Sequence, residues 1–254
     1  MANLDLQEKL KQWFNKTGFP LEIETTRAFF LQKFHVEHSA VYPDPETQQS
    51  REIDVLALRG DITGIFSILF PIECKTGDKP WVVLTDPDHY SWYSGLSIAI
   101  MSHKAQESLS QNVEEYADIY KNLFGQTAYG FSLKQAFSGE NDHAYTACMS
   151  TLKAAKSLVE EGVEHNRIIF AFPTLIVDTP IYEYSEGPNG EQFFNEVTSS
   201  SFFFSTQIKG YSKNIIRIVS NRALADYAEK CRALSDQYRA LFASQTKSLF
   251  RGGT

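Results

Sequence analysis

The chain has 254 residues, of which 43% are apolar and 13% aromatic, which suffices for a substantial core and excludes disorder of the whole chain. Its 31 acidic and 24 basic residues give a net charge of -7 and a pI near 5.4, which count against a protein that coats nucleic acid through a general basic field. The first residues lack the apolar run of a secretory signal and no later segment is apolar over the length of a bilayer, so we expect a cytoplasmic protein without membrane contact. Cys74, Cys148 and Cys231 have no paired spacing, and we expect buried core residues rather than a disulfide framework or a zinc site.

The first 75 residues predict two helices and three strands. Apolar residues at helical spacing predict a helix over residues 4–14, and Pro20 suits an early position in a second helix that runs to about residue 34. Three extended segments follow, separated by turns, over residues 36–42, 51–58 and 65–74. The last two are expected to form a hairpin with apolar side chains on both faces, which is typical of the centre of a covered sheet.

The rest of the chain alternates helices with strands. Helical spacing predicts helices over about 105–123, 143–161 and 222–242. Extended segments are expected at 167–172, at 174–177 and 181–184 as a hairpin, and at 202–208 and 215–219. This order predicts an α/β fold, with a central mixed β-sheet flanked by helices. No proline- or glycine-rich linker divides the chain, so we expect one elaborated domain over 1–254, with a core at about 18–185 and a C-terminal extension at about 186–254 that contains a β-hairpin and the long helix.

Charged residues interrupt two of the apolar strands. Asp54 lies inside the segment 51–58, where an unpaired carboxylate would carry a large desolvation cost. Glu73 and Lys75 follow in the next strand, on one face because side chains alternate with a period of two, and pairing of the two strands brings Asp54 beside them. Two converging carboxylates offer the hard oxygen ligands that Mg²⁺ or Mn²⁺ prefers. A neighbouring lysine can orient or deprotonate a water, or offset charge as a phosphate is attacked.

The arrangement of Asp54 followed by Glu73-Cys74-Lys75, on the second and third strands after an N-terminal helix, resembles the PD-(D/E)XK restriction-endonuclease-like superfamily. The resemblance covers about the first third of the chain. Ile53 stands where the family name has proline, and the region after Lys75 matches no subfamily pattern.

The resemblance implies a restriction-endonuclease-like core with a metal site on its sheet. Asp54 and Glu73 would bind Mg²⁺ or Mn²⁺, the backbone carbonyl of Cys74 would be a further ligand, and Lys75 would assist the nucleophilic water. In many relatives an acid on the preceding helix joins the site, and Glu22 is the first choice for this catalytic and metal-binding position.

Several of these residues have a plainer interpretation. Asp54 and its partners would otherwise be a structural ion-pair cluster at the rim of a sheet, and Glu22 an ordinary acid at a helix start, with Glu24 the second choice for the ligand. Glu52 shares a strand with Asp54 and is better explained as an exposed charge. Lys153 and Lys156, on the polar side of a helix, are candidates for lining a nucleic-acid groove or for surface charges without a role.

The function that follows is a metal-dependent nuclease that hydrolyses phosphodiester bonds in DNA, in restriction, repair or defence. The acidic pI indicates help from a homo-oligomer or a protein partner in holding DNA. Two other classes stay open: a catalytically silent nuclease-fold module that binds nucleic acid or regulates, and a hydrolase of small phosphate esters.

Overall fold

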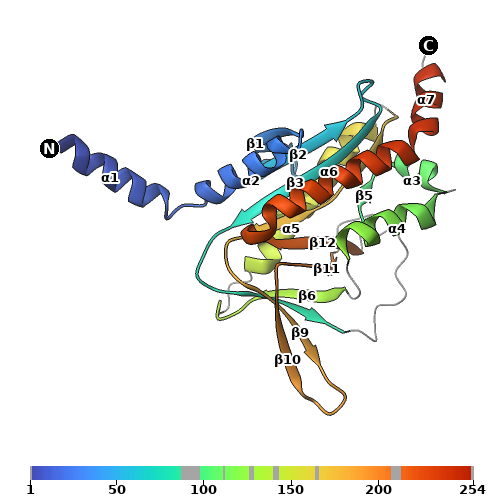
Figure 1. The fold of residues 1–254 in the computed structure, drawn as a ribbon. Helices are drawn as coiled ribbons and strands as arrows, with labels where there is room; N and C mark the ends of the chain where they lie inside the picture. The colour runs from blue at the N-terminus through green and yellow to red at the C-terminus, as the bar shows by residue number, and fades with distance from the viewer. Residues whose placement is uncertain are drawn as a thin grey trace.

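The computed structural model describes residues 2–86, 98–110, 112–125, 129–139, 143–163, 166–206 and 213–252, and these form an α/β fold with a large mixed sheet and helices on both of its faces (Figure 1). The helices are α1 (Ala2–Phe14), α2 (Phe19–Leu31), α3 (His103–Leu109), α4 (Val113–Phe124), α5 (His143–Val163), α6 (Leu224–Leu241) and α7 (Ala243–Gly252), with the 3-10 helix η2 at Asn221–Ala223. The strands are β1 (His35–Pro43), β2 (Ser50–Gly60), β3 (Phe66–Lys75), β4 (Trp81–Thr85), β5 (Ile100–Met101), β6 (Gly130–Gln135), β7 (Ile168–Ala171), β8 (Thr174–Val177), β9 (Ile181–Glu186), β10 (Gln192–Val197), β11 (Ser199–Ser205) and β12 (Lys213–Ser220).

The strands follow the order β1-β2-β3-β8-β12-β11-β6-β4-β9-β10, and β7 pairs with β3 and β5 off this path. The antiparallel pairing of β2 with β3 confirms the predicted hairpin. On its other edge β3 takes two parallel partners in succession, β7 over residues 66–69 and β8 over residues 72–75. Pro173, which has no N–H to donate, lies between these two partners. Strand β3 is therefore central, which explains why its residues are buried on both faces up to and including Cys74.

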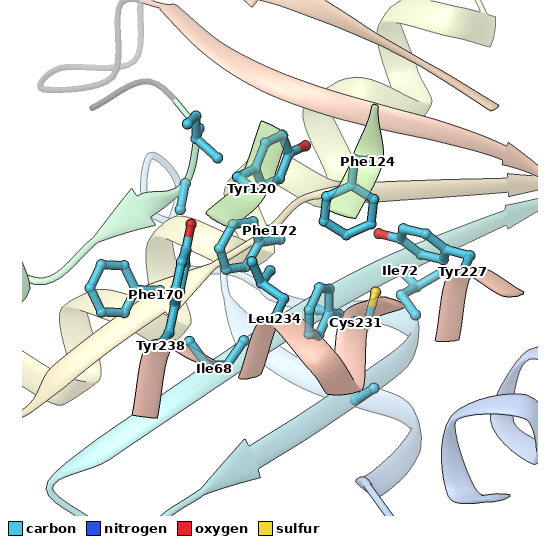
Figure 2. Close-up of a cluster of buried hydrophobic side chains, with 14 of the residues drawn as sticks. Ile68, Ile72, Tyr120, Phe124, Phe170, Phe172, Tyr227, Cys231, Leu234 and Tyr238 are labelled. Atoms are coloured by element: carbon cyan, nitrogen blue, oxygen red, sulfur yellow. The ribbon is translucent and has the colours of Figure 1, made fainter. Parts of the chain in front are cut away.

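Two clusters of buried side chains cover the two faces of the sheet. One face carries aromatic residues from α2, α4 and α6, and Figure 2 shows Tyr238 of α6 beside Phe170 and Phe172, and Tyr227 of the same helix beside Phe124. The other face is covered by α5, whose small side chains let the helix approach the strands; its buried alanines are Ala144, Ala147, Ala154 and Ala155. Complete burial of each large ring stabilises the fold by about 1.5–3 kcal/mol. The predicted burial of the three cysteines is confirmed.

The helix predicted over 105–123 is instead two helices, α3 and α4. The backbone N–H of Asn112 donates to the Leu109 carbonyl at 2.8 Å, which turns the chain between them. Ser102 caps α3 by accepting from the Ala105 N–H at 3.1 Å. Polar residues such as Ser110 and Asn112 favour a turn over a continuous helix. The apolar spacing on either side of them is helical, which is why a single helix was predicted. Gly125, with a φ of 59°, ends α4.

The prediction of a hairpin from residues 174–177 and 181–184 was wrong. Strand β8 lies between β3 and β12, and β9 lies between β4 and β10, so the two segments do not pair. Both edges of β8 are taken by strands distant in sequence, which local patterns do not reveal. Strands β4, β6 and β10 were not predicted, and β10 lacks an apolar alternation because five of its six residues are exposed.

The predicted C-terminal hairpin and long helix are present as β11, β12 and α6. Strand β11 covers Ser199–Ser205, and residues 207–208 of the segment predicted as extended lie outside the described residues. Strand β12 lies inside the sheet between β8 and β11, and the buried face of α6 belongs to the same cluster as α2. These C-terminal elements therefore share one sheet and one core with β3.

Candidate active site

Asp54 lies where β2 and β3 separate. Their regular pairing ends at Val55 and Ile72. Asp54, which precedes Val55 in the sequence, is therefore the first residue of β2 outside this pairing. The Oδ2 atom of Asp54 accepts a hydrogen bond from the backbone N–H of Cys74 at 2.7 Å, so a side chain takes the place of a strand carbonyl. On the edge of β2 that faces β1, the pairing of the two strands skips Asp54 of β2 and Ser39 of β1. Ser39 has a φ of 46°. The carboxylate is thus held in an interruption of the sheet, and an interruption of this kind opens backbone and side-chain atoms to a ligand.

Glu73 and Lys75 lie on the face of β3 that α5 covers. The Nζ atom of Lys75 donates to Oε1 of Glu73 at 2.5 Å, and the Ser150 hydroxyl of α5 donates to Oε2 at 2.8 Å. The Tyr42 hydroxyl donates to the Ser150 carbonyl at 3.3 Å, which ties this part of α5 to β1. The Glu73 side chain is 11% exposed and that of Lys75 34%, so the pair lies at the edge of the core within reach of solvent.

Glu22, on the first turn of α2, comes to the same place. Partial burial raises the pKa of the Glu22 carboxyl, the negative charges of Asp54 and Glu73 raise it further, and the positive charge of Lys75 opposes them. These effects place Glu22 within electrostatic reach of all three residues that the sequence singled out. Glu24 instead lines a neighbouring pocket of about 430 Å³ together with Thr76 and Gly77, among others.

The charges in this cluster do not cancel. Burial raises the pKa of Glu73, and Asp54 adds to the rise, although Lys75 and the Ser150 hydroxyl oppose both. Burial alone would lower the pKa of Lys75, but the charge of Glu73, its hydrogen bond to Lys75 and the charge of Asp54 together outweigh burial and raise the pKa above its ordinary value. Three carboxylates around one ammonium group leave negative charge that a cation would neutralise.

The donor set fits a hard divalent cation in chemistry but is not assembled around one point. Carboxylates of Asp54, Glu73 and Glu22 and the Cys74 carbonyl are the oxygen ligands that Mg²⁺ and Mn²⁺ prefer. Across the described part of the chain, no group of three or more His, Cys, Asp or Glu side chains is already arranged to hold a metal ion. Both Glu73 oxygens already accept hydrogen bonds, Oε1 from Lys75 and Oε2 from Ser150. A shift of the flexible Lys75 side chain would free Oε1.

Two residues of this site, Ser150 and Tyr42, were not among those that the sequence indicated. Their neighbours in sequence carry no unusual chemistry. The packing of α5 on β3 brings Ser150 to Glu73, and Tyr42 of β1 reaches the site through its hydrogen bond to the Ser150 carbonyl. Lys153 and Lys156 both take part in ion pairs, so neither is a surface charge without a contact, and a place for them along a nucleic-acid groove stays a prediction. Lys153 binds Asp44 at 3.0 Å and Glu46 at 2.7 Å, and the side chains of the two lysines are only 17% and 11% exposed.

Comparison with protein-family models, with curated proteins and with solved structures gives no match to this chain. The chemistry of the cluster therefore has to be argued from its own residues. None of the helices in the residues that the structure describes is long and apolar enough to cross a membrane.

Proposed function

We propose that this protein is a metal-dependent nuclease with a restriction-endonuclease-like core, and that it hydrolyses phosphodiester bonds in DNA in restriction, repair or defence. The observation that supports this most is the meeting of Asp54, Glu73 and Lys75 where β2 and β3 separate, with Glu22 beside them. Buried acids in an apolar strand are costly unless compensated, and a divalent cation is the compensation that suits a phosphodiesterase.

Each residue has a role that its surroundings favour. Asp54, Glu73 and Glu22, with the Cys74 carbonyl, would hold Mg²⁺ or Mn²⁺, which when bound polarises the phosphate and stabilises the leaving oxygen. Lys75 has a raised pKa and therefore stays protonated, which favours offsetting the charge of the attacked phosphate and orienting a water over acting as a base. Ser150 would fix the rotamer of Glu73 through Oε2, and Oε1 would become available to the cation when the Lys75 side chain shifts away from it.

A second candidate is a nuclease-fold module that binds nucleic acid or regulates without turnover. It is favoured by one observation, that both Glu73 oxygens already have hydrogen-bond donors in Lys75 and Ser150. A stable ion pair of this kind would satisfy the buried carboxylate without any metal.

The test compares cleavage of linear, circular, single-stranded and branched DNA with Mg²⁺, Mn²⁺ or EDTA. Glu73→Ala and Lys75→Ala should each lower the metal-dependent rate by about a hundredfold or more. Glu52→Ala, an exposed acid on the same strand as Asp54, is the matched control and should cleave like the wild type.

The outcomes separate the candidates. Cleavage that the two site substitutions leave unchanged would refute the assignment. Binding of metal and DNA without cleavage of any substrate would favour the binding module. Hydrolysis of free nucleotides or other small phosphate esters alone, with long DNA inert, would indicate a hydrolase of small substrates instead.

A further inference from the structure

A polar pocket opens beside the candidate active site, where three neighbouring strands end. Strands β3, β8 and β12 lie parallel, with Lys75 opposite Val177 and Val177 opposite Ser220. The residues that directly follow these three ends line a pocket of about 430 Å³, and they are Thr76, Gly77, Asp178 and Asn221. In open α/β sheets, ligands bind beyond the carboxyl ends of the parallel strands. The volume suits a small organic ligand, since sites of this kind measure about 300–1,000 Å³.

The start of α2 closes the other side of this pocket. Residues 15–17 line it together with three residues from the beginning of α2, which are Pro20, Leu21 and Glu24. The candidate active site lies directly beside it, because Lys75 precedes Thr76 in the chain and Glu22 is in the same part of α2. The pocket therefore adjoins the candidate site, while its own two acids are separate from those around Lys75.

The walls of the pocket favour a ligand that donates hydrogen bonds. The carboxylates of Glu24 and Asp178 only accept, whereas the amides of Asn15 and Asn221 both donate and accept. Lys16 is the one cation among the lining residues that the structure describes. Two acids against one lysine would repel a phosphate from the interior of the pocket. The edge of a nucleobase, which carries no charge and presents both donors and acceptors, fits this lining better.

Of the DNA bases, guanine presents the groups that this lining can pair with. Its Watson–Crick edge has two adjacent donors, N1–H and N2–H, which one carboxylate accepts together, and its O6 and N7 atoms accept from an amide. Adenine and cytosine set a single amino donor beside an acceptor on that edge, and the thymine N–H lies between two carbonyls, which a carboxylate repels. In duplex DNA the guanine edge is paired with cytosine, so guanine enters only when it is unpaired or extruded.

We infer that this pocket binds an unpaired guanine of the substrate strand and so holds a neighbouring phosphodiester beside Lys75. The inference rests on the proposed nuclease function and names its substrate as single-stranded or locally unpaired DNA that contains guanine. Pro20 and Leu21 supply apolar lining for the face of the base. Lys16 pairs with no acid within the part of the chain that the structure describes, and it is available to a phosphate of the same nucleotide.

Binding of free nucleotides to the full chain in EDTA tests the pocket apart from any cleavage. Calorimetry should show that dGMP binds at least about tenfold more tightly than dAMP, dCMP, dTMP and dIMP, the last of which lacks only the 2-amino group of guanine. Equal affinity for these nucleotides would overturn the inference, as would the absence of dGMP binding at about 10 mM.

Substitutions in the pocket show whether the preference for guanine arises there. Asp178→Asn should abolish the preference for dGMP over dIMP, because an amide cannot accept both donors of guanine. Its side-chain oxygen can still accept the Gly77 N–H, which Asp178 Oδ1 binds at 3.1 Å, so the fold is retained. Asn221→Asp, which removes an amide donor, should weaken dGMP binding as well. Asp118→Asn, at an exposed acid on α4, is the matched control and should bind dGMP like the wild type. A preference that survives both pocket substitutions would overturn the inference.

Cleavage of matched oligonucleotides separates this inference from the proposed function. Single strands that differ only in one guanine or one hypoxanthine should be cleaved beside guanine at least about tenfold faster in kcat/KM with Mg²⁺, and Asp178→Asn should remove this difference. Cleavage with no preference between the two bases would overturn the inference and leave the nuclease function standing. Selective dGMP binding in a protein that cleaves no DNA would support the pocket and remove the nuclease function on which its role as a substrate site rests.

Discussion

The two faces of the sheet are packed in different ways. One contributes mainly to the stability of the fold, and the other also brings polar groups to the candidate active site. The face under α2, α4 and α6 is filled by aromatic rings that touch one another (Figure 2). The face under α5 is packed with alanines, and from the same helix Ser150 and Lys153 reach polar partners on and beside the strands. Large rings exclude water from the first face, where the few polar groups pair with one another inside the cluster, whereas the small side chains of α5 bring that helix close enough for its polar groups to reach charged residues of the strands. We therefore expect substitutions of the aromatic rings on the first face to change mainly stability, and substitution of Ser150, which α5 brings to β3, to change mainly the site.

The largest effect is expected from Tyr238→Ala on the aromatic face. Tyr238 is fully buried, its ring stacks on that of Tyr116 at 4.7 Å, and its hydroxyl donates to the Tyr116 carbonyl at 2.9 Å. Removal should lower the free energy of unfolding by about 3–5 kcal/mol in urea denaturation. Phe137→Ala, at a ring that is 85% exposed, is the control and should change it by less than about 0.5 kcal/mol. A loss below about 1 kcal/mol in Tyr238→Ala would contradict the importance of this face.

A smaller effect is expected at Asp44, beside the α5 face. Although burial opposes it, hydrogen bonds from Lys153 and from the backbone N–H groups of Glu46 and Thr47 lower the pKa of Asp44 from 3.8 to about 2. The folded pKa is below the unfolded one, so the charge stabilises the fold above pH 3.8 and this contribution disappears as the pH falls through 2. Asp44→Asn should therefore lose about 2 kcal/mol at pH 7.

Denaturation of this variant at several pH values provides the check. The deficit relative to the wild type should shrink steadily as the pH falls from 4 towards 2. Asp118→Asn, at an exposed position on α4, serves as the control and should show no such trend. A deficit that is the same at pH 7 and near pH 2 would mean that packing, and not charge, is what the substitution removes.

The smallest effect is expected from Ser150→Ala. The substitution removes the donor to Glu73 Oε2 and should weaken binding of Mg²⁺, measured by calorimetry, about tenfold, with less than about 1 kcal/mol lost in unfolding. Thr at this position should restore part of the affinity. Ser157→Ala, a buried serine on the same helix, is the matched control. Equal metal affinity in Ser150→Ala and the wild type would show that Ser150 only packs α5.

The sequence alone predicted the part of the site that depends on the side-chain pattern of one strand and on a short turn. The period of two in β3 places Glu73 and Lys75 together, and the short turn after β2 makes pairing with Asp54 the simplest arrangement. Ser150 was beyond reach because it is 77 residues from Glu73 and only the packing of α5 joins them. The partners of β8, which are β3 and β12, could not be predicted for the same reason. The residue pattern of a strand indicates that it pairs but not with which strand.

The chain order of β1, β2 and β3 has a consequence for folding. Their pairings are local in sequence, whereas β3 acquires β7 and β8 only after about a hundred further residues and β12 last of all. Because contacts of low sequence separation form fastest, we expect the antiparallel unit of β1, β2 and β3 to form before the rest of the sheet. Glu22, Asp54 and Glu73 would then be near one another before α5 arrives with Ser150. The repulsion among them would oppose early compaction, so divalent cations should speed refolding even where they add little to the final stability.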